Sequence, residues 1–135
     1  MKIAVIYWSG TGNTEAMASA VAQGAGAELY SVSEFKGDVA EYDRLALGCP
    51  AMGAENLEEG EFEPFFADVE GKLSGKKVAL FGSYGWGDGE WMREWAERVK
   101  GDGAELVNGE GLIANESPDD DALAACKALG AKLAE

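Results

Sequence analysis

Apolar residues follow two alternating patterns along the chain. Short, nearly continuous apolar runs are typical of strands buried in a parallel sheet. They predict strands over residues 2–7, 29–32, 45–48, 77–83 and 106–107, the last with or without a further piece over 112–114. Between these runs, apolar residues return at the spacing of an amphipathic helix. Helices are expected over residues 15–23, from Pro64 to Gly75, from a cap at Asp88 to Gly101, over 119–133, and briefly over 38–43.

This alternation predicts a doubly wound α/β fold, in which helices cover both faces of a parallel sheet. The chain has 135 residues, the length of one domain, so residues 1–135 are expected to form a single unit. In such sheets, ligands bind beyond the carboxyl ends of the strands, where the strand order reverses. Three loops meet this condition, over residues 8–14, 48–60 and 83–89.

Composition narrows the class of protein. No apolar run approaches the about 20 residues of a membrane span, and the N-terminus enters a strand directly, so no secretory signal is expected. Cys49 and Cys126 lie far apart in the sequence and do not indicate a disulfide framework. The lack of histidine excludes the usual zinc sites and histidine-dependent catalytic triads. A reduced, cytoplasmic protein fits these features best.

The chain is strongly acidic, with 25 acidic and 11 basic residues and a net charge of −14. Nucleic acids and anionic membranes are poor partners for such a surface, because both are polyanions. A basic patch on another protein is a good partner, although acidity also serves solubility alone. We expect a monomer whose partners have basic surfaces.

The first loop combines hydroxyls, glycines and a helix start: Ser9, Gly10, Thr11, Gly12, Asn13 and Thr14. Free amides in the first helical turn and the helix dipole favour an anion there. The loop lacks the lysine of a P-loop, so it suits the phosphate monoester of a bound cofactor better than a nucleotide triphosphate. The alternative is a plain turn in which Gly10 and Gly12 relieve strain and Asn13 or Thr14 caps the helix.

The second loop follows the third strand and contains Pro50, Ala51, Met52, Gly53 and Glu55. The flexible side chain of Met52 could lie against a planar ligand, although a lone methionine is more often a core residue. Gly53 lets its peptide adopt two orientations, and Glu55 could accept a hydrogen bond from a ring N–H. The glutamates that follow in the sequence are best explained as side chains on a surface that faces solvent.

The third loop follows the fourth strand and contains Ser83, Tyr84, Gly85, Trp86, Gly87 and Asp88. Trp86 stands between two glycines and belongs to no helical or strand face, which favours a stacking platform over a tryptophan folded onto the surface. The three loops together provide a phosphate cradle, covers for a planar ring and hydrogen-bonding groups at its edge. FMN has this shape, and the lack of an acid–base pair or nucleophile favours electron transfer over bond-making chemistry.

Four stretches resemble the short-chain flavodoxins, and the resemblance extends along essentially the whole chain. They are residues 7–15, YWSGTGNTE; 47–53, LGCPAMG; 63–65, EPF; and 75–87, GKKVALFGSYGWG. The resemblance implies a five-stranded parallel sheet of order 2-1-3-4-5 in a three-layer α/β/α sandwich, the arrangement for which flavodoxin is a general example. It also implies non-covalently bound FMN.

The resemblance assigns a role to each loop. Ser9 to Thr14 would hold the phosphate, Ala51 and Ser83 would line the ribityl chain, and Met52 and Trp86 would enclose the isoalloxazine ring. At the edge of the ring, the amides of Gly85 and Gly87 would face the pyrimidine, and Glu55 would accept a hydrogen bond from N3. The Met52-Gly53 peptide would turn over when the flavin is reduced.

Two departures from the family pattern are visible. Pro50 stands where some relatives have a serine that could touch phosphate, and proline has no N–H to donate. Residues 22–28 form a short segment, so the first helix is expected to lose about a turn. Both changes are expected to alter affinity only modestly.

The resemblance implies a low-potential one-electron carrier that cycles between semiquinone and hydroquinone, and no enzymatic activity. An FMN-dependent NAD(P)H or quinone oxidoreductase on the same fold is the alternative, although no basic pocket for a pyridine nucleotide is visible. A phosphorylated receiver domain is disfavoured, because the first strand ends in Tyr7-Trp8 and the third in Gly48-Cys49 rather than in aspartates.

Overall fold

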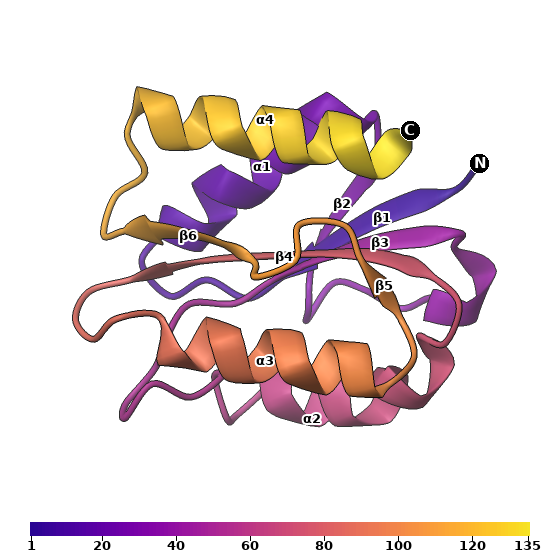
Figure 1. Cartoon of the computed structure of the whole chain (residues 1–135), viewed down its shortest axis with the longest axis horizontal. Coiled ribbons are helices and arrows are strands. Elements are labelled where there is room, and N and C mark those ends of the chain that lie inside the picture. The colour runs from indigo at the N-terminus through magenta and orange to yellow at the C-terminus, as the bar shows by residue number, and fades with distance from the viewer.

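The computed structural model describes all 135 residues as a sheet between two layers of helices (Figure 1). Its strands are β1 (Ile3–Tyr7), β2 (Glu28–Ser31), β3 (Arg44–Gly48), β4 (Lys77–Tyr84), β5 (Glu105–Leu106) and β6 (Leu112–Asn115). Its helices are α1 (Asn13–Ala25), α2 (Phe62–Val69), α3 (Glu90–Gly101) and α4 (Asp120–Ala134), with single 3-10 turns η1 (Val39–Glu41) and η2 (Glu70–Lys72). No helix is both long and apolar enough to cross a bilayer.

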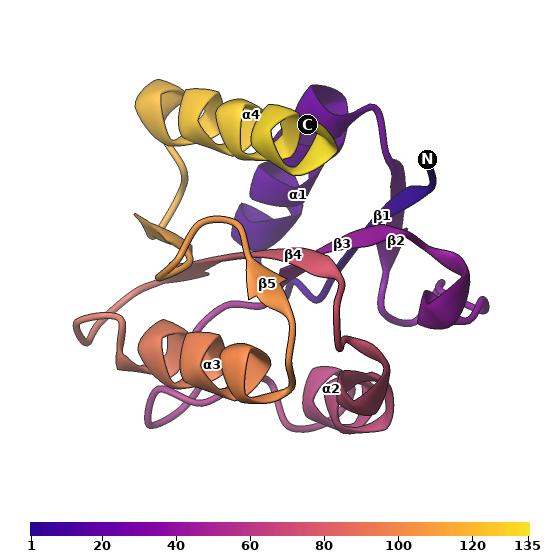
Figure 2. The same cartoon turned by 45° about the vertical axis from the view of Figure 1, so that its right-hand side comes forward.

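All strand pairs are parallel, and the order across the sheet is β2-β1-β3-β4-β5, as predicted. Helices α1 and α4 cover one face, and α2 and α3 cover the other (Figure 2). Alternate strand residues face opposite cores, so that Ile6 packs on the α2–α3 side while Val5 packs on the α1–α4 side. The predicted doubly wound fold is confirmed.

The outer edge of the sheet is divided between two strands. β5 pairs with the beginning of β4 and β6 pairs with its end, which confirms the optional sixth piece of strand. Between them, the side chain of Asn108 replaces the missing backbone partner: its Oδ1 accepts from Leu80 N at 3.4 Å, and its Nδ2 donates to Leu80 O at 2.9 Å. A side-chain amide thus continues the ladder across the gap.

The ends of the helices differ from the predicted ones more than the strand order does. α1 begins two residues before the predicted start and continues to Ala25, where Gly26 in the left-handed conformation ends it. Pro64 lies in the first turn of α2 as expected, but the α-helix ends at Val69 and continues only as the 3-10 turn η2. The predicted short helix over 38–43 is the single turn η1, capped by the Asp38 carboxylate.

Asn108→Ala is expected to lower the free energy of unfolding by about 1–3 kcal/mol, because it leaves two backbone groups of the fully buried Leu80 without partners. Asn115→Ala is the matched control, since Asn115 makes one exposed bond to Tyr84 O on the same strand. Urea denaturation of the cofactor-free protein measures both changes. Equal stability of the Asn108 variant and the unmodified protein would contradict the bridging role.

Candidate functional site

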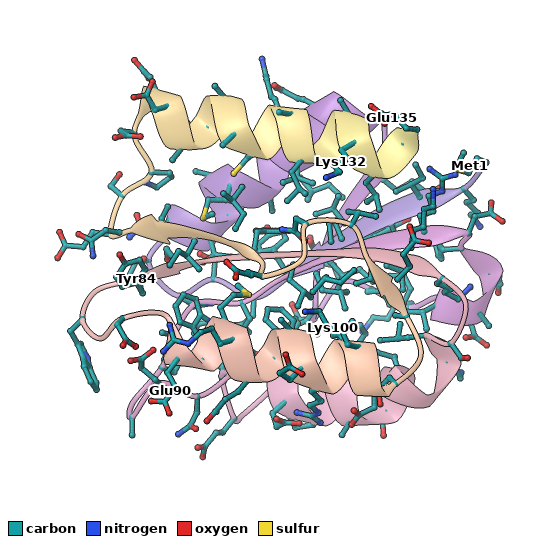
Figure 3. All side chains as sticks on the ribbon, viewed as in Figure 1. Met1, Tyr84, Glu90, Lys100, Lys132 and Glu135 are labelled. Atoms are coloured by element: carbon teal, nitrogen blue, oxygen red, sulfur yellow. The ribbon has the colours of Figure 1, made fainter.

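The three predicted loops leave the sheet at one edge, because β1, β3 and β4 are parallel and their carboxyl ends lie together. This edge lies away from the chain termini. Figure 3 shows Tyr84, the last residue of β4, at one end of the molecule and Met1 and Glu135 at the other.

A cavity of about 240 Å³ opens at this edge between the loops. Predicted residues from all three loops line it: Gly10, Thr11, Asn13, Pro50, Ala51, Met52, Ser83, Tyr84 and Gly85. The predicted residues outside its lining are Ser9, Gly12, Thr14, Gly53, Glu55, Trp86, Gly87 and Asp88. The structure therefore brings the three loops together around one space, with the remaining residues supporting or flanking it.

Trp8 and Glu116 also line the cavity, although the sequence analysis did not single them out. Trp8 lies in the first predicted loop, over residues 8–14, but no ligand contact is predicted for it. Glu116 directly follows β6, and its N–H donates to Tyr84 O at 2.6 Å, which places it beside the end of β4. The rule that ligands bind beyond strand carboxyl ends could have identified Glu116 if it had been applied to the last strand as well.

The first loop presents helix amides rather than a capped helix end. Gly12 is the N-cap of α1, with φ +95°, and no side chain caps the helix, so the alternative in which Asn13 or Thr14 does so is wrong. Ser9 Oγ instead accepts from Gly12 N at 3.1 Å, which closes the loop upstream of the helix. The first-turn amides of α1 have no partner within the helix, and such amides bind anions.

Thr14 connects the first loop to the third. Its side chain is buried, with Oγ1 3.1 Å from Ser83 Oγ, and it accepts from Ser83 N at 3.3 Å. The Thr14 hydroxyl is therefore engaged inside the protein, whereas its backbone amide belongs to the first turn of α1. Ser83 contacts Thr14 and also lines the cavity.

The second loop is a tight turn that displays Met52. Met52 and Asn56 exchange two backbone hydrogen bonds, each 2.8 Å long, and Gly53 between them has φ +53°. Met52 is 38% exposed and Trp86 in the third loop is 65% exposed. Two large apolar side chains thus stand in solvent beside the cavity, a feature expected of a site that receives a flat apolar ligand.

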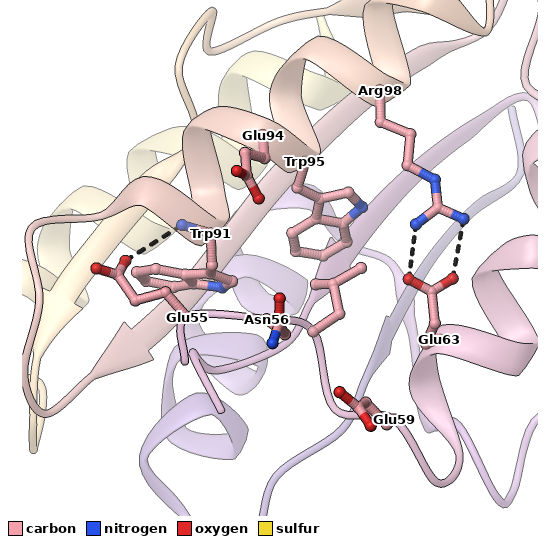
Figure 4. Close-up of a pocket in the computed structure, with 9 residues that line it drawn as sticks. Glu55, Asn56, Glu59, Glu63, Trp91, Glu94, Trp95 and Arg98 are labelled. Carbon is pink, nitrogen blue, oxygen red and sulfur yellow. Dashed lines mark hydrogen bonds and ion pairs between the residues drawn. The ribbon is translucent and has the colours of Figure 1, made fainter. Parts of the chain in front are cut away.

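Glu55 pins the second loop to the third. Its side chain is buried, and the carboxylate accepts from Asp88 N and from Trp91 N, each at 3.2 Å (Figure 4 shows the second bond). The two amides lie at the start of α3, whose N-cap, Gly89, has no side chain. A carboxylate has about four acceptor positions, so Glu55 can still accept from a ligand.

This contact explains why the predicted cap at Asp88 is wrong. The Asp88 side chain is exposed, and its Oδ1 accepts from Arg93 Nη2 at 3.0 Å. The Glu55 carboxylate accepts instead from a backbone N–H in the first turn of α3. The sequence pattern could not indicate a cap supplied from 33 residues upstream.

Glu58 holds the far end of the second loop at the start of α2. Its carboxylate accepts from the backbone N–H groups of Gly60, Glu61 and Phe62 at 2.7–2.8 Å. Partial burial raises the pKa of Glu58, but the three N–H donors outweigh this effect and hold the pKa below its usual value of 4.5.

Both cysteines are free and buried. Burial raises the pKa of Cys49 to about 12 and that of Cys126 to about 11, so both remain thiols at neutral pH. The cavity lining also contains no lysine or arginine. A bound phosphate would therefore rely on neutral hydroxyls and amides.

Comparison with known proteins identifies the family. The family model described as flavodoxin matches residues 5–130. The chain is 51% identical to the flavodoxin of Megasphaera elsdenii over 95% of both chains, and 48% identical to that of Clostridium beijerinckii over 96% of this chain and 97% of the relative. The chain belongs to the flavodoxin family.

Solved flavodoxin structures agree with this membership. The solution structure of two-electron reduced Megasphaera elsdenii flavodoxin superposes with a TM-score of 0.80 over 98% of both chains at 47% identity. A flavodoxin from the domain Archaea superposes with a TM-score of 0.86 over 99% of this chain and 96% of that chain at 28% identity. As a flavodoxin, the protein is an electron carrier that uses non-covalently bound FMN. The uncapped start of α1, the cavity between the three loops and the exposed apolar side chains beside it fit FMN.

Gly87→Ala is expected to destabilise the cofactor-free protein by about 1–3 kcal/mol. Gly87 has φ +88°, and an added Cβ would lie 2.1 Å from Glu55 Oε1, so the contact between the two loops would break. Gly85→Ala is the control, because its Cβ meets no atom within 4 Å. Chemical denaturation measures both variants, and equal losses would contradict a special role for the contact at Gly87.

Glu58→Gln is expected to lower thermal stability at neutral pH, with a difference from the unmodified protein that shrinks as the pH falls below 4.5. The folded-state pKa of Glu58 lies below the unfolded value, so its stabilisation is complete above 4.5 and disappears as the pH falls through the folded pKa. Glu59→Gln is the control, since the neighbouring Glu59 side chain makes no hydrogen bond. Melting curves across the pH range test this; a difference independent of pH would contradict it.

Proposed function

We propose that the first loop and the start of α1 bind the FMN phosphate, and that Met52 and Trp86 enclose the flavin ring. The observation that carries this assignment is the cavity at the carboxyl edge, which joins the uncapped start of α1 to the exposed side chain of Met52. Ala51 and Ser83 lie between them in the lining and suit the ribityl chain. Bound FMN supplies one-electron redox chemistry, and the protein supplies orientation and exclusion of water.

We assign the ring edge to the loops that Glu55 joins. The backbone N–H groups of Gly85 and Gly87 are the donors proposed for the pyrimidine edge, and the free acceptor positions of Glu55 serve a ring N–H. Tyr84, Pro50 and Asp88 complete the proposed surroundings, with Asp88 at the exposed rim.

We further propose that the carrier is monomeric, acts in the cytoplasm as one domain, and exchanges electrons with basic-surfaced redox proteins. The net charge of −14 supports basic partners, because opposite charge accelerates encounter. The NAD(P)H or quinone oxidoreductase alternative is not favoured, since the chain matches flavodoxins along nearly its whole length.

Anaerobic titration with FMN and then with a reductant tests the function. The protein is expected to bind one FMN and to take up two electrons in two separate one-electron steps, visible in the absorbance spectrum. A protein that ignores added FMN contradicts the assignment of the cofactor site. A single two-electron step contradicts the assignment as a one-electron carrier.

Gly53→Thr is expected to narrow the gap between the two one-electron potentials by about 60 mV, which corresponds to a tenfold change in the equilibrium constant for disproportionation of the one-electron-reduced protein. Gly53 has φ +53° and open space around it, so its peptide can reorient, whereas a β-branched residue resists the left-handed conformation. Redox titration measures the gap. An unchanged gap would remove reorientation of this peptide from the account.

Electron delivery to a basic acceptor is expected to slow as salt is added, because screening weakens attraction between the partners. Stopped-flow mixing of the reduced protein with oxidised cytochrome c, a lysine-rich haem protein, measures the rate. Rates that do not depend on ionic strength would make the acidity of the surface incidental to partner encounter.

A further inference from the structure

Trp8 links the first loop to the start of α2, a connection that neither Glu55 nor Thr14 provides. Its indole Nε1 donates to Glu61 Oε1 at 3.0 Å. The contacts of Glu55 with Asp88 and of Thr14 with Ser83 both involve the third loop. The bond from Trp8 instead joins the first loop to the residue that directly follows the second loop. Each pair of loops therefore has a side-chain contact between its members.

The acceptor of this bond is held by its own backbone. Glu61 is the N-cap of α2. Its N–H donates to Glu58 Oε1 at 2.7 Å, and its carbonyl oxygen accepts from Phe65 N at 3.2 Å. The Glu61 carboxylate thus extends from a fixed point of the chain. Because an indole has a single N–H to donate, a fixed acceptor selects one orientation of the ring.

The Trp8 ring stands between two hollow spaces. One is the cavity of about 240 Å³ assigned to the cofactor. The other is a polar pocket of about 360 Å³, whose lining includes Glu15, Glu34 and Glu61. Trp8 belongs to both linings and is half-buried. Packing constrains such a ring less than it would constrain a core residue, so the hydrogen bond to Glu61 sets its orientation.

The same ring supports the backbone of the first loop. Gly10 lies directly against it, since a Cβ added at Gly10 would lie 3.0 Å from Trp8 Cη2. Gly10 and Thr11 line the cofactor cavity together with Trp8. From Thr11 the chain continues into Gly12, the uncapped N-cap of α1. A ring held against Gly10 therefore limits the positions that the backbone can take just before the amides of α1.

We propose that Trp8 is a positioning residue for the phosphate. Bonded to Glu61, its ring holds the first loop in the conformation that presents amides and hydroxyls to the anion. Trp8 and Glu61 act on the loop rather than on the ligand, because Trp8 Nε1 is already engaged and Glu61 lies outside the cavity lining. The proposal rests on the proposed cofactor site. It predicts an effect on FMN and almost none on riboflavin, which lacks the phosphate.

Fluorescence titration of the cofactor-free chain with FMN and with riboflavin tests the proposal through the ratio of the two affinities. Trp8→Phe keeps an aromatic ring and removes the N–H donor. It is expected to lower the FMN-to-riboflavin ratio about fivefold, the effect of one hydrogen bond. A general loosening of the fold would weaken the binding of both flavins and leave the ratio unchanged.

Two substitutions of the acceptor separate the hydrogen bond from the charge. Glu61→Gln keeps an acceptor oxygen for Trp8 Nε1 and removes the charge, whereas Glu61→Ala removes both. The first is expected to keep the ratio of the unmodified protein, and the second to lower it about fivefold. If Glu61 acted on the anion by repulsion, both substitutions would raise the ratio. Glu59→Ala is the matched control, since Glu59 is exposed and lies outside the cavity lining.

An FMN-to-riboflavin ratio that Trp8→Phe leaves unchanged, or that Glu61→Gln and Glu61→Ala change equally, overturns the positioning role. If Trp8→Phe fails to fold, the two substitutions at the exposed Glu61 decide the question. The unmodified protein distinguishes this failure from failure of the proposed site. Equal affinities of the unmodified protein for the two flavins count against the phosphate site itself. A preference for FMN that survives in Trp8→Phe and Glu61→Ala counts against the role of Trp8 alone.

Discussion

The buried carboxylate of Glu55 is the contact on which the arrangement of the site depends. It accepts from two backbone amides at the start of α3 and so fixes the turn that carries Met52 against the loop that carries Trp86. The contact between Thr14 and Ser83 does the same for the first loop and the end of β4. Two small polar contacts thus hold together three loops that are distant in sequence. The sheet alone would only bring their starting points to one edge.

The proposed cofactor site has no cation of its own to pair with the phosphate. No lysine or arginine lines the cavity, and the chain as a whole has a net charge of −14. In the proposed site, the phosphate relies on amides at the start of α1 and on hydroxyls, whose donors are fixed by the fold. The same surplus of negative charge opposes the addition of an electron to the bound group, which favours a low potential. Tight anchoring and a low potential are compatible because different parts of the protein produce them.

The sequence predicted the fold and the meeting of three loops at one edge of the sheet better than the contacts between those loops. Continuous apolar runs such as residues 77–83 identified the strands, and the carboxyl-edge rule selected three loops that the structure brings together around one cavity. The bridge between Glu55 and the start of α3 was not predictable, because it joins residues 33 and 36 positions apart and replaces a local cap at Asp88. The Asn108 side chain that replaces a strand residue was missed for the same reason. Local patterns reveal neither contact, since both depend on the completed sheet.

The first loop is proposed as a phosphate anchor made of neutral donors. Comparing the affinities of the cofactor-free protein for FMN and for riboflavin, which lacks only the phosphate, tests it most directly. Charge-assisted hydrogen bonds from the amides of α1 predict FMN binding at least about 100-fold tighter than riboflavin binding. Fluorescence titration measures both constants. Equal affinities for the two flavins would contradict the claim.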